Sequence, residues 1–277
     1  MLNKFFIEEH VKKSLQEDIG FGDITTDYLT NETDMMQCSL NTRVDGIFCG
    51  KEVFKTVFEI LSNEVNITFY FNDGDEIKKG DKIADISGPA KYVLMGERTA
   101  LNYIQRMSGI ATETNKYQQQ IGEYKAKIVD TRKTTPLFRA FEKYSVKTGG
   151  GSLHRFNLSD CAMIKDNHIK YAGSLKNAVE KLKENISHAH KIEVECDTEA
   201  QVKEALDCNV DIIMLDNMTL EQMTKCVNLI NGKAIVEASG NVNLSTVRDI
   251  AKTGVDIISS SAIVAKAPTL DLGLDIE

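Results

Sequence analysis

Short runs of β-branched and other apolar residues recur along the second part of the chain and alternate with amphipathic stretches. Most runs are separated by segments of helical periodicity, such as LKNAVEKLKEN and TEAQVKEALDC. This alternation predicts βα units around a parallel sheet. Six strands of this kind fit a closed barrel, and they also fit an open sheet. The runs occupy residues 127–130, 162–164, 191–195, 211–215, 233–237 and 256–260.

The first hundred residues show a different rhythm. Phe6, Val11 and Leu15 share one face of a short helix predicted over residues 1–17. Strand-like patterns follow, interrupted by one helix predicted at residues 51–62. In the stretch FNDGDEIKKGDKIADI, two glycine turns separate short apolar segments, which predicts a structural hairpin.

These two patterns divide the chain into domains. A long helix predicted over residues 97–122 connects them. We expect an N-terminal α/β domain over residues 1–104 and a second α/β domain over residues 105–265. The tail, residues 266–277, is expected to pack back on the first domain.

Composition narrows the function classes. The chain has 277 residues, with 33 basic and 41 acidic side chains and a net charge of −8. A hydrophobic fraction of 42 % is typical of a globular protein and excludes a disordered chain. The acidic balance argues against a nucleic-acid partner, and the apolar runs are too short to span a membrane. The start, MLNKFFIEEHVKK, lacks the apolar core of a signal peptide. Six cysteines without a C-x-x-C pair predict reduced, mostly buried thiols in a cytoplasmic protein.

Polar side chains follow each of the six predicted strands, and the active sites of β/α barrels lie at these carboxyl ends. A single polar residue after a strand is usually a helix cap or part of a turn. Six polar ends that carry both cations and carboxylates instead predict a binding site. The ends are Asp130 to Lys133, Lys165 to His168, Glu195 to Asp197, Asp216 and Asn217, Glu237 to Asn241, and Ser259 to Ser261.

Positive charge is concentrated between residues 130 and 170. This segment has eight Lys or Arg residues and four Asp or Glu residues, a net charge of +4 within a chain of −8. We assign Lys143, Lys147 and Lys170 to the solvated surface. The remaining cations suit a ligand with several carboxylates or phosphates, which guanidinium groups bind bidentately. The glycine run at residues 149–151 allows close approach of the backbone to a phosphate.

Two acids at strand ends, Glu195 and Asp216, have the chemistry to hold a hydrated Mg²⁺ or the hydroxyls of a ribose. A structural ion pair with Lys165 or Arg132 is the other interpretation of either carboxylate. From the residues alone, the two interpretations are equally well supported for each carboxylate.

The sequence resembles one family over nearly its whole length. The motifs that carry the resemblance are EDIGFGDITT, ERTALNYIQRMSGIAT, DTRKTTP, EKYSVKTGGGSLHRFNLSD, IKDNHI, IEVECDT, IIMLDN and VEASGN, in this order. They are similar to the motifs of quinolinate phosphoribosyltransferase, a type II phosphoribosyltransferase. The resemblance implies an N-terminal α/β sandwich domain, a C-terminal six-stranded α/β barrel and a homodimer.

The implied reaction joins quinolinate to phosphoribosyl pyrophosphate (PRPP). It gives nicotinate mononucleotide, carbon dioxide and pyrophosphate, with Mg²⁺ as cofactor, and it supplies NAD biosynthesis. Charge neutralisation and positioning carry most of such chemistry, so no protein nucleophile is required. The sequence agrees with this, because it offers no Ser/His or Cys/His constellation.

The resemblance also assigns roles to individual residues. Arg98 matches the arginine that reaches into the neighbouring subunit's site to bind quinolinate. Glu195 and Asp216 match two acids beside the PRPP ribose and Mg²⁺, and with Lys133 and Lys165 they form the implied catalytic set. The implied quinolinate and phosphate pocket contains Thr131, Arg132, Lys133, His154, Arg155 and Lys165. Two implied phosphate loops contain Ser239, Gly240 and Asn241, and Ser260, Ser261 and Ala262.

Three positions depart from the commonest family pattern. Leu137 follows TTP where a glycine is usual, Asn241 stands where many members have a second glycine, and Ser261 replaces a frequent glycine. We expect phosphate binding to survive, because Ser and Asn still offer backbone N–H groups. Leu137 is expected to alter the path of its loop.

Three other functions fit parts of the sequence. A paralogue of the same fold, such as the ModD type, would act on another acceptor, but Arg98, Arg132, Arg155 and the intact IKDNH motif speak against it. A Schiff-base aldolase would use Lys165 as its nucleophile and would be trapped by borohydride. A non-catalytic barrel would bind a phosphorylated ligand without turnover.

Overall fold

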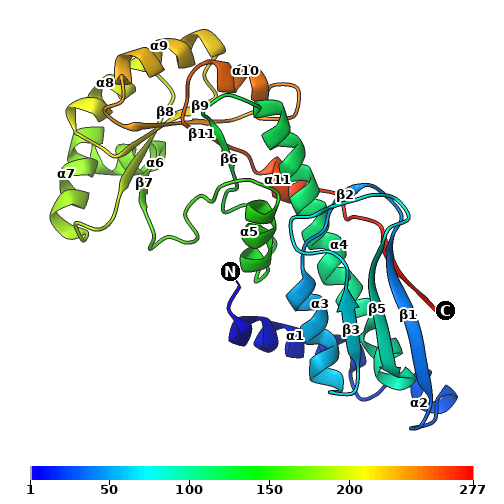
Figure 1. Ribbon diagram of the computed structural model, residues 1–277. Coiled ribbons are helices and arrows are strands. Elements are labelled where there is room, and N and C mark those ends of the chain that lie inside the picture. The colour runs from blue at the N-terminus through cyan, green and yellow to red at the C-terminus, as the bar shows by residue number, and fades with distance from the viewer. Residues whose placement is uncertain (1, 277) are drawn as a thin grey trace. The chain divides into compact units, whose positions relative to one another are not determined.

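A computed structural model of the chain describes residues 2–276. The described residues form two compact units, which Figure 1 shows in chain order by colour. The first unit contains the residues up to Glu113, together with 140–150 and those from Ala267 onward. The second contains Thr114–Arg139 and Gly151–Lys266. The expected boundary near residue 105 falls inside one helix, α4 (Ala90–Ile121), which continues from the first unit into the second.

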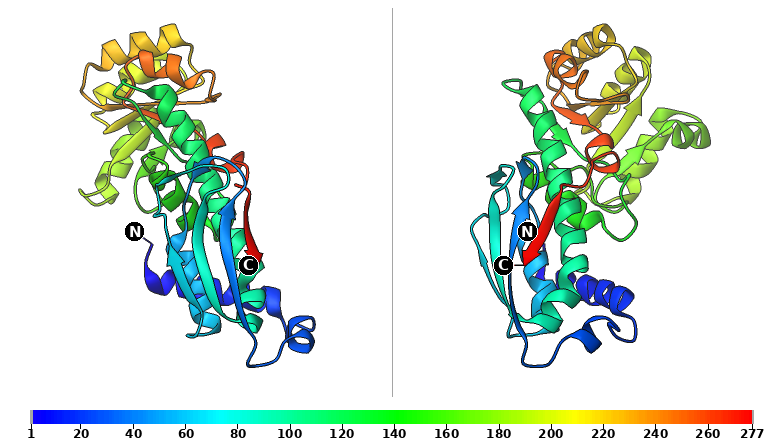
Figure 2. Two further views of the ribbon diagram at one scale, coloured as in Figure 1. Left: turned by 45° about the vertical axis from the view of Figure 1, so that its right-hand side comes forward. Right: turned by 90° about the vertical axis from the view of Figure 1, so that its right-hand side faces the viewer.

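The first unit is built on an antiparallel sheet with the strand order β12-β1-β5-β3 (Figure 2). Its last strand pairs with β1, where Leu40 lies opposite Leu274. The strands of this sheet are β1 (Met35–Thr42), β3 (Asn66–Phe69), β5 (Lys82–Pro89) and β12 (Leu272–Ile276). Its helices are α1 (Lys4–Ile19), α2 (Thr26–Leu29), α3 (Lys51–Leu61) and the first part of α4.

The two helices predicted in this unit are confirmed. Helix α1 buries Ile7, Val11 and Leu15, which follow one another at four-residue steps on one face. Phe6, which the sequence placed on that face, is instead 38 % exposed. Helix α3 buries two adjacent pairs, Val53 with Phe54 and Val57 with Phe58, and α1 packs against it.

The predicted hairpin after residue 70 is wrong in its pairing. Both glycine turns exist, since Gly74 and Gly80 have φ angles of 98° and 94°. The short strand between them, β4 (Glu76–Ile77), pairs with β2 (Gly46–Ile47). Strand β5 pairs with β1 and β3 instead. Turn residues indicate where a chain reverses, but they do not determine which strand it then meets.

Helix α5 (Arg139–Thr148) corrects a second expectation. It follows the first strand of the second unit, yet its residues after Arg139 belong to the first unit. Lys143, assigned above to the solvated surface, is only 2 % exposed, and its neighbours Phe141 and Glu142 are fully buried. Lys143 therefore lies on a covered face of α5. Lys147 and Lys170 are exposed, as predicted.

The second unit contains a parallel sheet that has, within residues 2–276, six strands in the order β6-β11-β10-β9-β8-β7. This confirms the predicted α/β class and the parallel sheet. In the described chain no ladder joins the edge strands β6 and β7, and Ser152 forms an isolated parallel bridge with Val129 at the β6 edge. The strands are β6 (Lys127–Val129), β7 (Ala162–Ile164), β8 (Ile192–Cys196), β9 (Ile212–Asp216), β10 (Ile235–Ser239) and β11 (Ile257–Ser259).

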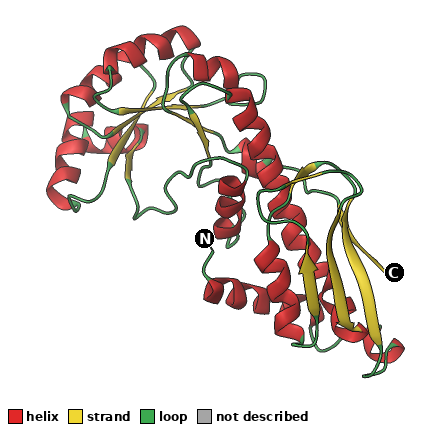
Figure 3. Cartoon of the chain, in the orientation of Figure 1, coloured by secondary structure: helices red, strands yellow, loops and turns green. Residues whose placement is uncertain are grey.

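Helices connect these strands and cover one face of the sheet (Figures 1 and 3). Helices α8 and α9 each begin with a capping box, formed by Thr198 with Gln201 and by Thr219 with Gln222. Asn231 ends α9 in the left-handed region, at a φ of 43°. The helices are α6 (Asp166–Ala172), α7 (Leu175–Asn185), α8 (Glu199–Asp207), α9 (Leu220–Ile230), α10 (Val247–Lys252) and α11 (Ala262–Ala265).

Two further expectations concern the cysteines and membranes. All six cysteines are free thiols, four buried and two half-buried, which confirms the predicted pattern. Among the described residues, no helix combines the length and the apolar character needed to cross a membrane.

Candidate active site

Alternate residues of neighbouring parallel strands share one face of the sheet and form rows across it. The register sets these rows. One row contains Glu195, Met214, Glu237 and Ile257 on β8, β9, β10 and β11. One step toward the carboxyl ends, Asp216 lies opposite Ser239. One step toward the amino ends, Met163 lies opposite Glu193. The rows bring acids from three strands to one side of the sheet.

A cavity of about 330 Å³ opens at the carboxyl ends of these strands. Ten residues that the sequence nominated line it, two of them, Glu237 and Ser259, only as polar strand ends. The other eight are Thr131, Arg132, Lys133, His154, Arg155, Lys165, Glu195 and Ser239. Two further lining residues, Met163 and Met214, were not nominated. Their signal was available in the sequence, because each lies two residues from another lining or strand-end residue and so shares its face of the strand.

The other nominated residues lie outside the cavity lining, either at the carboxyl ends of the strands or on α4. Asp216 is the last residue of β9, and Gly240 and Asn241 follow β10 directly. Ser260 and Ser261 follow β11, and Ala262 begins α11. None of these six belongs to the cavity lining. Arg98 is an exposed residue of α4 in the first unit, whereas the lining comes entirely from the second.

Arg139 connects two loops of the cavity. Its Nε donates a hydrogen bond to Oγ1 of Thr134, and its Nη1 donates to the carbonyl oxygen of Phe156, both at 3.0 Å. Its Nη2 lies 3.5 Å from the carbonyl oxygen of Arg132. The loop that carries Arg132 is therefore tied to the segment that follows Arg155. Arg139 is one of the eight cations between residues 130 and 170, and its place in the sequence does not indicate this role.

Arg155 is held from one side. Its Nη1 donates to the carbonyl oxygen of Cys161 at 2.8 Å, and its Nη2 lies 3.5 Å from the sulfur of Met163. These contacts fix the plane of the guanidinium within the cavity wall, which prepares it for a planar anion.

The imidazole of His154 lies between two buried carboxylates. Its Nε2 is 3.4 Å from Oε1 of Glu237 and 3.6 Å from Oε2 of Glu193. Glu193 is 1 % exposed and Glu237 is 2 % exposed. Burial lowers the pKa of His154, but the neighbouring carboxylates of Glu193 and Glu237 outweigh it and raise the pKa to about 9. Burial also raises the pKa of Glu193.

This trio suits a proton better than a metal ion, although its ligand atoms lie within 4.8 Å of one another. Nδ1 of His154 accepts a hydrogen bond from the backbone N–H of Arg155 at 2.7 Å. In the neutral ring the hydrogen is then on Nε2, facing the carboxylates, whereas a metal would need the Nε2 lone pair. A second proton on Nδ1 would displace the Arg155 bond, which opposes the effect of the carboxylates.

The two acids at the strand ends have different surroundings. Glu195 Oε2 forms an ion pair with the ammonium of Lys165, one of the two interpretations that the sequence left open. Oδ2 of Asp216 accepts a hydrogen bond from the side-chain amide of Asn217 at 2.7 Å. One oxygen of each carboxylate is therefore engaged by a neighbour on the same face or loop.

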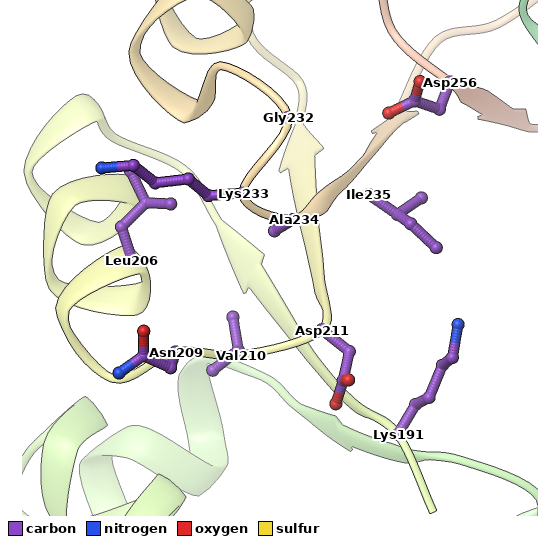
Figure 4. A pocket seen from close by; sticks show the side chains of 10 residues that line it. All are labelled: Lys191, Leu206, Asn209, Val210, Asp211, Gly232, Lys233, Ala234, Ile235 and Asp256. Atoms are coloured by element: carbon purple, nitrogen blue, oxygen red, sulfur yellow. The ribbon is translucent and has the colours of Figure 1, made fainter.

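Two other cavities occur in the second unit. One, of about 400 Å³, shares His154, Arg155 and Glu237 with the first cavity and reaches Glu193. Another, of about 730 Å³, lies at the amino ends of the strands (Figure 4). Its carboxylates bind the backbone: Asp211 accepts from the N–H of Ile192 at 2.8 Å, and Asp256 accepts from the N–H of Val236 at 2.9 Å. We therefore assign it a structural role, as is usual at this end of a barrel.

Comparison with known proteins supports one family. The family model for the C-terminal domain of quinolinate phosphoribosyl transferase matches residues 110–275, and the model for its N-terminal domain matches residues 23–108. The chain belongs to the quinolinate phosphoribosyltransferase family. A relative from Bacillus subtilis, named a probable carboxylating nicotinate-nucleotide pyrophosphorylase, is 39 % identical over 276 residues. That match covers 100 % of this chain and 92 % of the relative.

Solved structures of the quinolinate phosphoribosyltransferase family agree with the fold. A nicotinate-nucleotide pyrophosphorylase from Francisella tularensis superposes with a TM-score of 0.96 at 38 % identity, covering 100 % of this chain and 98 % of the other. A nicotinate-nucleotide pyrophosphorylase from Ehrlichia chaffeensis gives a TM-score of 0.95 at 41 % identity, with both chains fully covered. The two-domain fold of the family is therefore the fold of this chain.

The three departures from the usual family pattern behave differently. Leu137 and Asn241 adopt positive φ angles of 63° and 53°, so the backbone keeps the conformation that suits glycine. Asn tolerates this region well, whereas Leu does so only with strain. Ser261 has a φ of −74°, so nothing in its backbone requires a glycine.

Proposed function

We propose that the chain transfers the phosphoribosyl group of PRPP to quinolinate with loss of carbon dioxide. The products are nicotinate mononucleotide and pyrophosphate, which places the reaction in NAD biosynthesis. The observation that carries the proposal is the cavity in which Arg132, Lys133, Arg155 and Lys165 gather at the carboxyl ends of the strands. Quinolinate is a dianion and PRPP a polyanion, so both need such a concentration of cations. Membership of the family supports the same reaction.

In the free site, Lys165 and Glu195 partly neutralise each other. An incoming dianion therefore meets Arg132, Lys133 and Arg155 as a cationic wall without strong repulsion from the neighbouring carboxylate. The ion pair also engages the side-chain nitrogen of Lys165 with a carboxylate, whereas a Schiff-base aldolase needs that nitrogen free to attack a carbonyl carbon. This contact supports the transferase over the aldolase.

The donor set near the strand ends fits Mg²⁺. Mg²⁺ takes oxygen ligands and is commonly bound by one or two carboxylates together with substrate phosphates and water. Glu195 and Asp216 would hold it, on the neighbouring strands β8 and β9. When bound, it would neutralise charge that develops on the departing pyrophosphate.

The reaction depends on the positioning of the two substrates and on electrostatic stabilisation of the transition state more than on covalent catalysis. The pyridine nitrogen of quinolinate attacks the anomeric carbon, and the bond from that carbon to pyrophosphate breaks with its electron pair leaving on oxygen. The carboxylates of Glu195 and Asp216 stabilise the oxocarbenium character of the transition state. Lys133 and the neighbouring arginines neutralise the leaving group.

Decarboxylation follows from the first step. The ring nitrogen becomes cationic once it is bonded to ribose, and this charge stabilises the carbanion left when the adjacent carboxylate departs as carbon dioxide. One proton then replaces that carboxylate and completes nicotinate mononucleotide. Lys165 and His154 both line the cavity, so the candidates for the proton donor are these two side chains and a water molecule.

We also propose that the enzyme is a homodimer in which Arg98 of one subunit completes the quinolinate site of the other. Two observations support this arrangement. Arg98 is exposed on α4, and the cavity lining in a single chain lacks it. A third arginine would add a bidentate contact to a dianion that already meets Arg132 and Arg155.

The direct test incubates the purified protein with quinolinate, PRPP and Mg²⁺ and follows carbon dioxide and nicotinate mononucleotide. Equimolar release of both is the expected result. Turnover with a different aromatic acceptor but none with quinolinate would establish the paralogue instead. Borohydride trapping at Lys165 would establish an aldolase, and binding without any turnover would leave only a non-catalytic barrel.

The shared site has its own test. Arg98→Ala is expected to remove most activity, while Lys91→Ala, which removes a cation from the same helix, leaves it near wild type. Mixing equal amounts of Arg98→Ala and Lys165→Ala subunits should restore about a quarter of the wild-type activity. About half of the dimers are then heterodimers, and one of the two sites in each heterodimer is intact. Absence of complementation despite demonstrated subunit exchange contradicts the shared site.

A further inference from the structure

We infer that Asn217 and Asn241 are positioning residues for Asp216. The inference rests on the function proposed above, in which the Asp216 carboxylate acts beside the ribose and the leaving pyrophosphate. It concerns two side chains on different loops, one following β9 and one following β10. Asn217 contacts Asp216 directly, and Asn241 reaches it through Asn217.

The contacts form a chain of three side chains. Nδ2 of Asn241 donates to Oδ1 of Asn217 at 3.1 Å. Nδ2 of Asn217 donates to Oδ2 of Asp216 at 2.7 Å. The backbone N–H of Asn217 donates to the carbonyl oxygen of Ser239 at 3.0 Å, which ties the same two loops together.

Each link depends on the chemistry of an amide. Asn217 accepts at its oxygen and donates at its nitrogen, and a carboxylate or an aliphatic side chain cannot do both. The bond from Asn241 occupies the oxygen of Asn217, so the nitrogen of Asn217 faces Asp216. Reversal of this amide would place its oxygen against the carboxylate and cause repulsion. Asn241 thus selects the orientation that holds Asp216.

The backbone is built to allow this arrangement. Asn217 and Asn241 both have a φ of 53°, in the left-handed region that Asn tolerates. Gly240, between Ser239 and Asn241, has a φ of 91°. A Cβ at Gly240 would overlap Oδ1 and Cγ of Asn217 and would lie 2.9 Å from its backbone nitrogen. The glycine therefore makes room for the Asn217 amide.

The consequence concerns PRPP and not quinolinate. A carboxylate that is fixed before the substrate binds stabilises the transition state without reorganisation. Loss of the Asn217 donor removes a hydrogen bond to a charged group, and loss of the Asn241 donor removes a bond between neutral groups. We expect kcat/KM for PRPP to fall about tenfold or more in Asn217→Gly and about three- to tenfold in Asn241→Gly. Quinolinate binding measured without PRPP should stay unchanged.

Glycine is the substitution to use, because it accepts the positive φ without strain. The matched control is Asn231→Gly, the same change at another left-handed Asn, at the end of α9 and outside the site. The double variant Asn217→Gly/Asn241→Gly separates a chain of contacts from two independent effects. If Asn241 acts through Asn217, the double variant should lose no more activity than Asn217→Gly alone.

Wild-type turnover of quinolinate and PRPP in the same experiment tests the proposed function separately. With active wild type, a fall in kcat/KM for PRPP with unchanged quinolinate binding, non-additivity in the double variant and a control at wild-type level support the inference. Weakened binding of quinolinate in the absence of PRPP, additive effects, or an Asn241→Gly variant as active as wild type overturns it. Asn241 is exposed, so its substitution tests the inference even where Asn217→Gly folds poorly.

Discussion

Gly240→Ala tests the crowded geometry around Asp216 by adding a single methyl group. Its matched control is Gly232→Ala, because Gly232 has a similar φ of 75° but no heavy atom within 4 Å of an added Cβ. The control carries only the backbone strain of a left-handed residue, about 1–2 kcal/mol. The smaller conformational freedom of alanine in the unfolded chain offsets about 0.4–1 kcal/mol of this strain. We expect Gly232→Ala to cost about 0.5–1 kcal/mol.

Gly240→Ala carries the same strain and an overlap in addition. The new methyl group would meet the amide of Asn217 and its backbone nitrogen at 2.9 Å. Crowding of this kind typically costs about 1–3 kcal/mol. For a protein of this size, 1 kcal/mol corresponds to about 2–4 °C in Tm, so Gly240→Ala should unfold about 2–12 °C below Gly232→Ala.

Differential scanning fluorimetry of both variants and the wild type, without ligands, measures this difference. In the same preparations, kcat/KM for PRPP should fall in Gly240→Ala and stay at the wild-type level in Gly232→Ala. Two variants that unfold within about 1 °C of each other would refute the reasoning, because Asn217 would then move aside at no cost.

Three further predictions address other parts of the second unit. Leu137→Gly should raise the Tm by about 1–4 °C, because Leu137 is strained at a φ of 63° and 88 % exposed, whereas Leu158→Gly, at an exposed leucine without positive φ, should lower it. Arg139→Gln should raise KM for quinolinate about tenfold by releasing the loop of Arg132, and Lys147→Gln should not, as initial rates of carbon dioxide release will show. Burial raises the pKa of the Cys161 thiol to about 11, so its alkylation by iodoacetamide should accelerate about tenfold per pH unit between pH 8 and pH 10. The Cys161→Ser variant identifies that reaction, and a rate independent of pH contradicts the assigned burial.

Much of the second unit could be predicted from the sequence. The six strands were found because β-branched runs alternate with amphipathic helical stretches. Their polar ends identified eight lining residues of the cavity, since parallel strands bring their carboxyl ends to one edge. These features depend on residues close together in the chain, so local patterns carry them.

The interior rows were harder to predict. Glu193 lies inside an apolar run and was not predicted as a site residue, and Glu237, which is buried in β10, was predicted only as a polar end of its strand. The signal was their spacing, since Glu193 stands two residues before Glu195 and Glu237 two before Ser239. Which acids share a row depends on register across strands, which no local pattern contains.

Long-range pairings account for the remaining differences. The prediction placed residues 266–277 on the first domain but did not identify β12 as a strand, because five residues of mixed character carry little signal until β1 is placed beside them. The partner of β4 was missed for the same reason. Lys143 is buried because a segment between two strands of the second unit belongs to the first.

The position of β12 in the sequence also determines when the first unit can be completed during protein synthesis. Strand β1 begins at Met35, but its partner β12 begins at Leu272, after every residue of the second unit has left the ribosome. Until then one edge of β1 lacks its partner strand, and an open strand edge invites pairing with other chains. The second unit can fold before the first unit is complete. This reverses the usual folding order, in which the N-terminal domain folds before the C-terminal domain. A fusion that masks the last strand would prolong the exposure of β1, so its cost would appear as aggregation during expression.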